Sequence, residues 1–179
     1  MASIPDTYKE AFEVEHHFHG GARWFGATAA PPGGGVGPGL ISSLNPFRVT
    51  ANALAMTFGN AIVVLDGTED FQKADYVALY DPHQIFITNV QATGTYKIRF
   101  ANSQWNGTVH AYANMAEAVV ANKYTEIVIK TDNTNSEATP LDCMSGRIRY
   151  GSILWAQVMK ATAGADYVDF LVGCHTYTM

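Results

Sequence analysis

The densest group of side chains able to bind a metal ion or a proton is His16-His17-Phe18-His19, close to the N-terminus. If this segment is extended, His17 and His19 project from one face, where imidazole nitrogens can share a metal ion. The following residues, 20–24, contain no carboxylate that would complete such a ligand set. We therefore expect no metal site there, and interpret the histidines as a packed or interfacial polar cluster.

The residues next to this cluster support an interfacial role. Arg23-Trp24-Phe25 follows closely, and arginine and tryptophan are enriched at the energetic centres of protein interfaces. An alternative is that Trp24 and Phe25 are ordinary core residues. Our prediction is one contact surface that contains six residues: His16, His17, His19, Arg23, Trp24 and Phe25.

Sequence signatures of catalysis are missing. No Gly-x-Ser-x-Gly motif is present, so a hydrolase nucleophile would lack its strained turn. The glycine-rich segment is not followed by Gly-Lys-Ser or Gly-Lys-Thr, whose lysine and hydroxyl group bind phosphate and magnesium. We therefore expect no enzyme activity, no catalytic residue, no cofactor and no bound metal.

The positions of the carboxylate residues are more typical of turns than of a metal-binding site. Asp66, Glu69 and Asp70 lie close together, but the Gly67-Thr68 dipeptide between them favours a solvated turn over a weak calcium site. Other aspartates occur where predicted strands end, a position at which Asp commonly caps a turn. These residues are Asp75, Asp81 and Asp169.

The chain is poor in charge. Only 15% of its 179 residues are Asp, Glu, Lys or Arg, against roughly 25% in ordinary soluble domains. Uncharged residues must therefore cover much of the surface, and we expect partners to bury it, with the few Asp, Glu and Lys facing outward. The formal net charge is −5 and no three basic residues are adjacent, which excludes a typical nucleic-acid binder.

Other bulk properties narrow the class further. No apolar stretch approaches the roughly 18 residues of a membrane span, so no membrane partner is expected. The first ten residues contain no apolar signal-peptide core, and we expect synthesis in the cytoplasm without Sec-type export. Cys143 and Cys174 form no Cys-x-x-Cys pair and are interpreted as buried or half-buried thiols.

Short alternating segments indicate an all-β protein. Apolar side chains at Tyr96, Ile98 and Phe100 alternate with Lys97 and Arg99, as in a strand with one wet face. The predicted strands cover Ile62–Leu65, Val77–Tyr80, Ile85–Val90, Tyr96–Phe100, Thr125–Lys130, Arg147–Tyr150, Ile153–Met159 and Val168–Cys174. Turn signals separate them at Asp66-Gly67, Asp81-Pro82, Thr93-Gly94, Asn106-Gly107, Gly151-Ser152 and Ala163-Gly164. This pattern predicts a β-sandwich or barrel.

A glycine- and proline-rich segment, Ala29–Gly39, divides the chain. Such a run holds neither helix nor strand, so it is a long loop or an extended arm. We predict an N-terminal segment with this arm over residues 1–40 and a β-sandwich domain over residues 41–179. Within the domain, Ala111–Ala121 has a helix-forming composition, although a long loop with one helical turn is the alternative.

Five blocks of the sequence carry a resemblance. They are Val14-Glu15-His16-His17-Phe18-His19 with Arg23-Trp24-Phe25-Gly26, then Asp81 to Thr88, Lys123 to Ile129, Leu154 to Val158, and Val168 to Tyr177. In this order they resemble small virion structural proteins of tailed bacteriophages, of the type that decorates or cements the icosahedral head. The histidine-aromatic block is the most specific, whereas residues 36–65 and 105–121 match poorly.

The resemblance implies a jelly-roll-like antiparallel β-sandwich that forms a homotrimer on the outer capsid surface of the virion. Each subunit would bind the major capsid protein and bridge neighbouring capsid subunits, so that its binding free energy stabilises the shell. We expect the protein to be made in the host cytoplasm. The expected partners are the major capsid protein and further copies of this chain.

Two alternatives compete with a capsid decoration protein. One is a carbohydrate-binding β-sandwich displayed on the virion head or on a tail fibre, with Trp105, Tyr112 and Tyr124 stacking on sugars. The other is a cupin-like metal enzyme that uses His17 and His19, although the glutamate ligand of that family is missing here. A glycan array tests the first alternative, and metal analysis of the purified protein tests the second.

Overall fold

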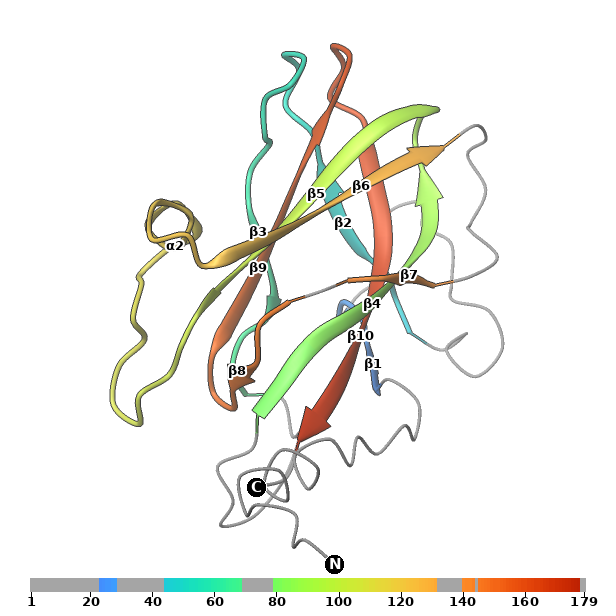
Figure 1. Cartoon of the computed structure of the whole chain (residues 1–179). Coiled ribbons are helices and arrows are strands. Elements are labelled where there is room, and N and C mark those ends of the chain that lie inside the picture. The colour runs from blue at the N-terminus through green and yellow to red at the C-terminus, as the bar shows by residue number, and fades with distance from the viewer. Residues whose placement is uncertain (1–22, 29–43, 69–78, 132–139, 144, 178–179) are drawn as a thin grey trace, which may run out of the picture.

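The computed structural model describes residues 23–28, 44–68, 79–131, 140–143 and 145–177, so the glycine- and proline-rich arm lies outside it. Within these ranges the chain forms ten strands and one short helix (Figure 1). They are β1 (Arg23–Phe25), β2 (Phe47–Thr50), β3 (Ile62–Leu65), β4 (Leu79–Val90), β5 (Gly94–Ser103), α2 (Met115–Val120), β6 (Tyr124–Thr131), β7 (Leu141–Asp142), β8 (Ile148–Arg149), β9 (Ile153–Lys160) and β10 (Tyr167–Tyr177).

The strands form two antiparallel sheets. In the first sheet, β10 and β4 are the central pair; β1 and β2 share the outer side of β10, and β7 and β8 share the outer side of β4. The second sheet has the order β3-β9-β5-β6. The prediction of an all-β sandwich is confirmed.

The connections make this sandwich a jelly roll. The chain passes from β2 in the first sheet to β3 in the second, returns to β4, and then enters the second sheet for β5 and β6. It returns again for β7 and β8, crosses to β9, and ends in β10 beside β2. Pairing of β10 with β2, and of β9 with β3, is the double Greek-key order of a jelly roll, to which β1 adds one further edge strand.

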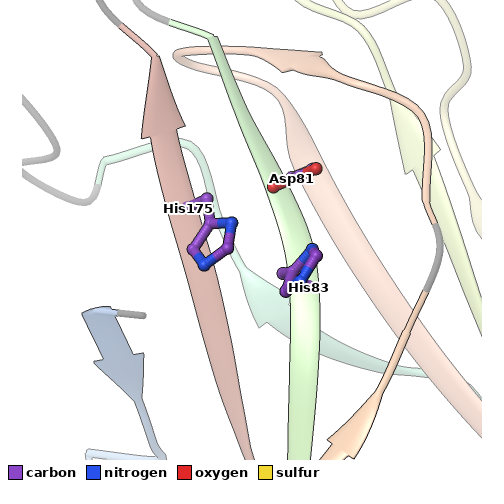
Figure 2. Close-up of side chains that lie close together, drawn as sticks. All are labelled: Asp81, His83 and His175. Carbon is purple, nitrogen blue, oxygen red and sulfur yellow. The ribbon is translucent and has the colours of Figure 1, made fainter. Parts of the chain in front are cut away.

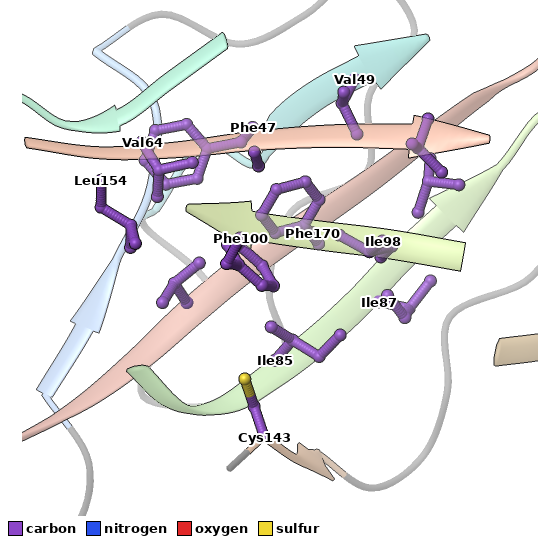
Figure 3. Packing of buried hydrophobic residues seen from close by; sticks show 14 of the residues in the cluster. Phe47, Val49, Val64, Ile85, Ile87, Ile98, Phe100, Cys143, Leu154 and Phe170 are labelled. Carbon is purple, nitrogen blue, oxygen red and sulfur yellow. The ribbon is translucent and has the colours of Figure 1, made fainter. Parts of the chain in front are cut away.

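The core lies between the two sheets. Strand alternation sends Val168, Phe170, Val172 and Cys174 of β10 inward, and all four are buried. Phe170 bridges the sheets: its ring centroid lies 5.9 Å from that of Phe47 in the first sheet and 5.8 Å from that of Phe100 in the second (Figure 3). Both cysteines are buried and no disulfide joins them, and Cys143 lies at the edge of this cluster.

The region that we expected to turn at Asp81-Pro82 is instead continuous strand. β4 runs through both residues, and its pairing with β10 shifts register between Gly173 and Cys174. Because proline donates no hydrogen bond, it is tolerated inside a sheet mainly at such irregularities. The expectation that Asp81 and Asp169 cap strand ends is also wrong, since both lie within strands.

Buried ion pairs also correct our expectation that every Asp, Glu and Lys faces outward. Asp169 is 0% exposed and accepts hydrogen bonds at 2.7 Å from both Nε and Nη2 of Arg48 on the neighbouring strand β2. Lys160 is also buried and pairs with Asp166, while Asp81 is 8% exposed. A carboxylate or ammonium group is tolerated inside a protein when an opposite charge and hydrogen bonds compensate its lost hydration.

The predicted helical segment contains one six-residue helix, α2. Asn114 caps its N-terminus by accepting a hydrogen bond from the Glu117 backbone N–H, and the Glu117 carboxylate accepts one from the N–H of Ala113. Met115 and Ala118 on one face of α2 pack on the outer side of the second sheet, away from the core. In Figure 1 the helix lies beside the beginning of β6.

Candidate functional site

The structure describes half of the predicted contact residues. The other half lies outside the described ranges: His16, His17 and His19. Arg23, Trp24 and Phe25 form β1, which adds to the edge of the first sheet beside β10. Part of the predicted N-terminal segment is thus built into the sandwich.

The two aromatic residues of β1 face different environments. Trp24 packs edge-on against Phe86 on the outer face of the first sheet, with 6.4 Å between ring centroids. Phe25 packs against the core between the sheets, which agrees with the core alternative for this residue. Both side chains are only half-buried, so each keeps exposed surface for a partner. Their role in an interface remains a prediction.

A different cluster brings together side chains that could bind a metal ion. Asp81 and His83 lie on β4, and His175 lies on the neighbouring strand β10 (Figure 2). His175 follows the inward-facing Cys174, and Asp81 is its register partner, so strand alternation places the cluster on the outer face of the first sheet. We call these three residues the His-Asp cluster.

The geometry of the His-Asp cluster is compact. One ligand atom from each residue lies within 4.8 Å of the other two. The imidazole rings of His83 and His175 stack, with 4.0 Å between centroids and 23° between planes. Asp81 is buried, whereas both histidines are half-buried and accessible from solvent. Two imidazole nitrogens and one carboxylate oxygen are suitable ligands for a divalent transition metal.

Local contacts fix the backbone that carries the cluster. The carbonyl oxygen of His83 accepts a hydrogen bond from the backbone N–H of Cys143 at 2.6 Å, and the carbonyl oxygen of Pro82 accepts one from Ser145 Oγ at 3.0 Å. The irregular stretch of β4 is therefore held on its outer edge as well as by β10. Burial, together with the nearby charge of Asp81, raises the pKa of the Cys143 thiol to about 12. Cys143 is thus a neutral thiol in the metal-free protein, and its side chain belongs to the core between the sheets.

Sequence reasoning missed this cluster for identifiable reasons. His83 and His175 are far apart along the chain, and only the pairing of β4 with β10 brings them together. Reading Asp81-Pro82 as a turn hid the fact that Asp81 and His83 belong to one strand. The Asp-x-His spacing of these two residues was the available local signal.

The predicted turn at Asp66 is present in the described part of this segment. Oδ1 of Asp66 accepts hydrogen bonds from the backbone N–H of Thr68 at 2.8 Å and from its hydroxyl at 2.6 Å. This is the arrangement of an Asx-type turn. The other carboxylates considered with it lie outside the described residues: Glu69, Asp70 and Asp75.

One end of the sandwich presents an uncharged apolar surface. It is formed by residues 53–56 of the β2–β3 loop and residues 161–163 of the β9–β10 loop, which we call the apolar end. Leu54 is 67% exposed and Met56 is 63% exposed. Backbone hydrogen bonds hold the two loops side by side, from Gly164 N–H to Ala53 and from Met56 N–H to Lys160 (Figure 1). Exposed large apolar side chains that lie together on the surface are typical of contact surfaces.

The aromatic residues considered for sugar binding do not form a common platform. Trp105 packs against His110, with 4.8 Å between ring centroids, and Tyr112 packs beside α2. Tyr124 lies under the guanidinium group of Arg99, 4.8 Å from it, and borders a pocket of about 240 Å³. Polar side chains that line this pocket are Asn102, Gln104, Asn122, Lys123, Thr125, Ser145 and Arg147.

No protein-family model and no curated protein matches the chain. Among the helices of the described residues, none has the length and apolar character needed to cross a membrane.

Proposed function

We propose that this protein is a structural subunit of a tailed-bacteriophage virion that decorates the outer face of the head and bridges major capsid protein subunits. The observation that carries the proposal is the apolar end, an ordered surface without charge on a jelly-roll sandwich. The net charge of −5 suits an exterior position away from packaged DNA. The location on the phage head and the assembly into a homotrimer come from the resemblance of the sequence blocks.

The apolar end has the energetic properties of a contact surface. Burying a leucine or methionine side chain contributes about 1.5–3 kcal/mol each, so Leu54 and Met56 together can supply several kcal/mol of binding free energy. The loops that carry them are already ordered by hydrogen bonds, so little conformational entropy is lost on binding. Binding of many such subunits stabilises the shell by mass action.

Replacing both exposed side chains by asparagine should remove binding while leaving the fold intact. We expect the Leu54→Asn/Met56→Asn variant to bind purified heads about 100-fold more weakly, because roughly 3 kcal/mol of apolar burial is lost. Occupancy of the heads is measured by quantitative gel analysis after sedimentation. Val120→Asn is the matched control, since Val120 is apolar and 85% exposed on α2 but lies outside the apolar end. Equal occupancy of all three proteins would show that the apolar end is not the contact.

The predicted N-terminal contact can be tested separately. A deletion through Gly39 would remove β1 and with it part of the first sheet, so its effect would mix binding with stability. Deleting residues 1–22 keeps β1 and removes His16, His17 and His19. We expect this variant to keep its unfolding temperature within a few degrees and to lose occupancy on heads. Unaltered occupancy would remove the N-terminal segment from the proposed interface.

Carbohydrate binding is the second candidate, favoured by the polar pocket next to Tyr124. Its amide and cationic side chains can donate hydrogen bonds to sugar hydroxyl groups. The pocket is smaller than the roughly 300–1,000 Å³ typical of ligand sites, which favours the structural role. A glycan array on the isolated protein separates the two candidates. Specific glycan binding that is lost in Tyr124→Ala would support the second.

A further inference from the structure

We propose that the His-Asp cluster binds one divalent transition-metal ion, with zinc as its best match, through Asp81, His83 and His175. This inference does not depend on the proposed virion role, because it rests only on the geometry of the first sheet. Neither the sequence motifs nor the contact surfaces described above require a metal. The cluster is also distinct from the histidine segment at the N-terminus.

The donor set points to a transition metal over calcium or magnesium. Zinc binds imidazole nitrogen and carboxylate oxygen readily, whereas calcium and magnesium prefer sites made entirely of oxygen ligands. Two histidines and one carboxylate supply three ligands, which leaves at least one coordination position for water or for an added donor. The partial exposure of both histidines gives an ion a path from solvent.

The positions of the three residues meet the distance requirement of such a site. A tetrahedral zinc ion with bonds of about 2.0–2.1 Å places its ligand atoms about 3.3 Å apart. The ligand atoms here lie within 4.8 Å, so the longest separation must shorten by up to about 1.5 Å. Rotation of the side chains supplies this movement without moving the strands. The stacked rings must tilt from their near-parallel arrangement so that their lone pairs converge on one ion.

The backbone under the cluster is suited to hold that geometry. Both strands are central in the first sheet, and the register partner of Asp81 is His175 itself. The hydrogen bonds to the carbonyl groups of Pro82 and His83 fix the irregular part of β4. A site built on paired central strands loses little entropy when it orders its side chains around an ion.

The direct test is titration of the metal-free chain of 179 residues with zinc, monitored by isothermal titration calorimetry. We expect one zinc ion per chain, and at least about 100-fold weaker binding in His83→Ala and in His175→Ala, since even indirect partners of a metal change affinity about 10–100-fold. The matched control is His110→Ala, because His110 is a half-buried histidine that contacts Gly151 and Trp105 outside the cluster. A second control replaces His16, His17 and His19 together by alanine.

The outcomes separate the two histidine groups. Wild-type affinity in the triple N-terminal variant, together with weak binding in His83→Ala, supports the proposal. Loss of zinc binding in the triple variant and retention in His83→Ala and His175→Ala would assign the ion to the N-terminal segment and overturn it. Absence of any zinc binding above micromolar affinity in the wild type would overturn it as well.

A second measurement guards against variants that fail to fold. Cobalt(II) substituted for zinc gives visible absorption that reports nitrogen and oxygen coordination, and thermal unfolding of each metal-free variant shows whether it is folded. At a zinc concentration 100 times the dissociation constant, the unfolding temperature of the wild type should rise by about 5–10 °C. The conservative variant Asp81→Asn should fold and lose most of this rise. A rise equal to that of the wild type in all three cluster variants would contradict the assigned ligands.

Discussion

Replacing Phe170 by alanine is expected to lower the free energy of unfolding by about 3–5 kcal/mol. The side chain is 0% exposed and contacts the rings of Phe47 and Phe100, so its removal leaves a cavity between the two sheets (Figure 3). Both the lost burial and the unfilled cavity contribute to this cost. Chemical denaturation, monitored by tryptophan fluorescence, measures this loss of free energy. The unfolding temperature should fall by roughly 10–15 °C at the same time.

Two control variants show whether the loss of stability comes from the cavity that Phe170→Ala creates. Phe170→Leu keeps most of the apolar volume and should cost clearly less than the alanine variant. Val120→Ala removes a similar kind of side chain from a site that is 85% exposed, and should change the free energy of unfolding by less than about 0.5 kcal/mol. If Phe170→Ala were no more destabilising than Val120→Ala, the two sheets would not be packed through this ring.

The second large effect is expected from Arg48→Ala, at about 3–5 kcal/mol of lost stability. Asp169 is 0% exposed, and the variant removes the guanidinium group that donates two hydrogen bonds to its carboxylate. It also removes the cation that stacks over the ring of Tyr167, 3.5 Å from its centroid. An uncompensated carboxylate would remain buried in the first sheet. Urea denaturation at neutral pH measures the difference.

A double variant separates the effect of the unpaired charge from that of the lost contacts. Arg48→Met/Asp169→Leu removes both charges and should recover most of the stability, because a buried ion pair is often replaceable by apolar residues of similar size. Lys97→Ala provides the surface comparison: Lys97 pairs with the half-buried Glu126, and its loss should cost no more than about 1 kcal/mol. If the double variant were as unstable as Arg48→Ala, the hydrogen-bonded ion pair between Arg48 and Asp169 would itself be required for stability.

The two functional proposals concern opposite ends of the first sheet, so their tests do not interfere. β10 begins beside the apolar end, at Tyr167, and reaches the His-Asp cluster at His175. At about 3.3 Å per residue, these positions are about 26 Å apart. A variant at Leu54 should therefore leave zinc affinity unchanged. A variant at His83 should likewise leave the contact surface of the apolar end intact.

Much of the sandwich could be predicted from local patterns. The alternation in Tyr96–Phe100 and in Val168–Cys174 placed β5 and β10 correctly, and it identified which side chains face the core. Turn dipeptides such as Asn106-Gly107 marked real turns, with Gly107 at a φ of +99°. These signals depend on neighbours in sequence, because strand alternation and turn conformation are local properties of the backbone.

Other elements gave no reliable local signal. β1 and β2 are short, and each is stabilised mainly by pairing with β10, which lies more than a hundred residues further along the chain. Asp81-Pro82 carries a strong turn signal, yet tertiary pairing with β10 overrides it and keeps β4 continuous. A local preference of this kind is weak compared with the free energy of packing and pairing along two long central strands.

The charged residues, 15% of the chain, also separate what the sequence determines from what only tertiary contacts decide. The sequence by itself determined an all-β chain with a low-charge surface, since alternation and composition are visible without the fold. Only the tertiary structure decided where the few charges and histidines lie. It buried Asp169 against Arg48, brought His83 beside His175, and placed the exposed Leu54 and Met56 together on one loop end. These placements depend on contacts between distant segments, and such contacts exist only after the strands have paired in the jelly-roll order.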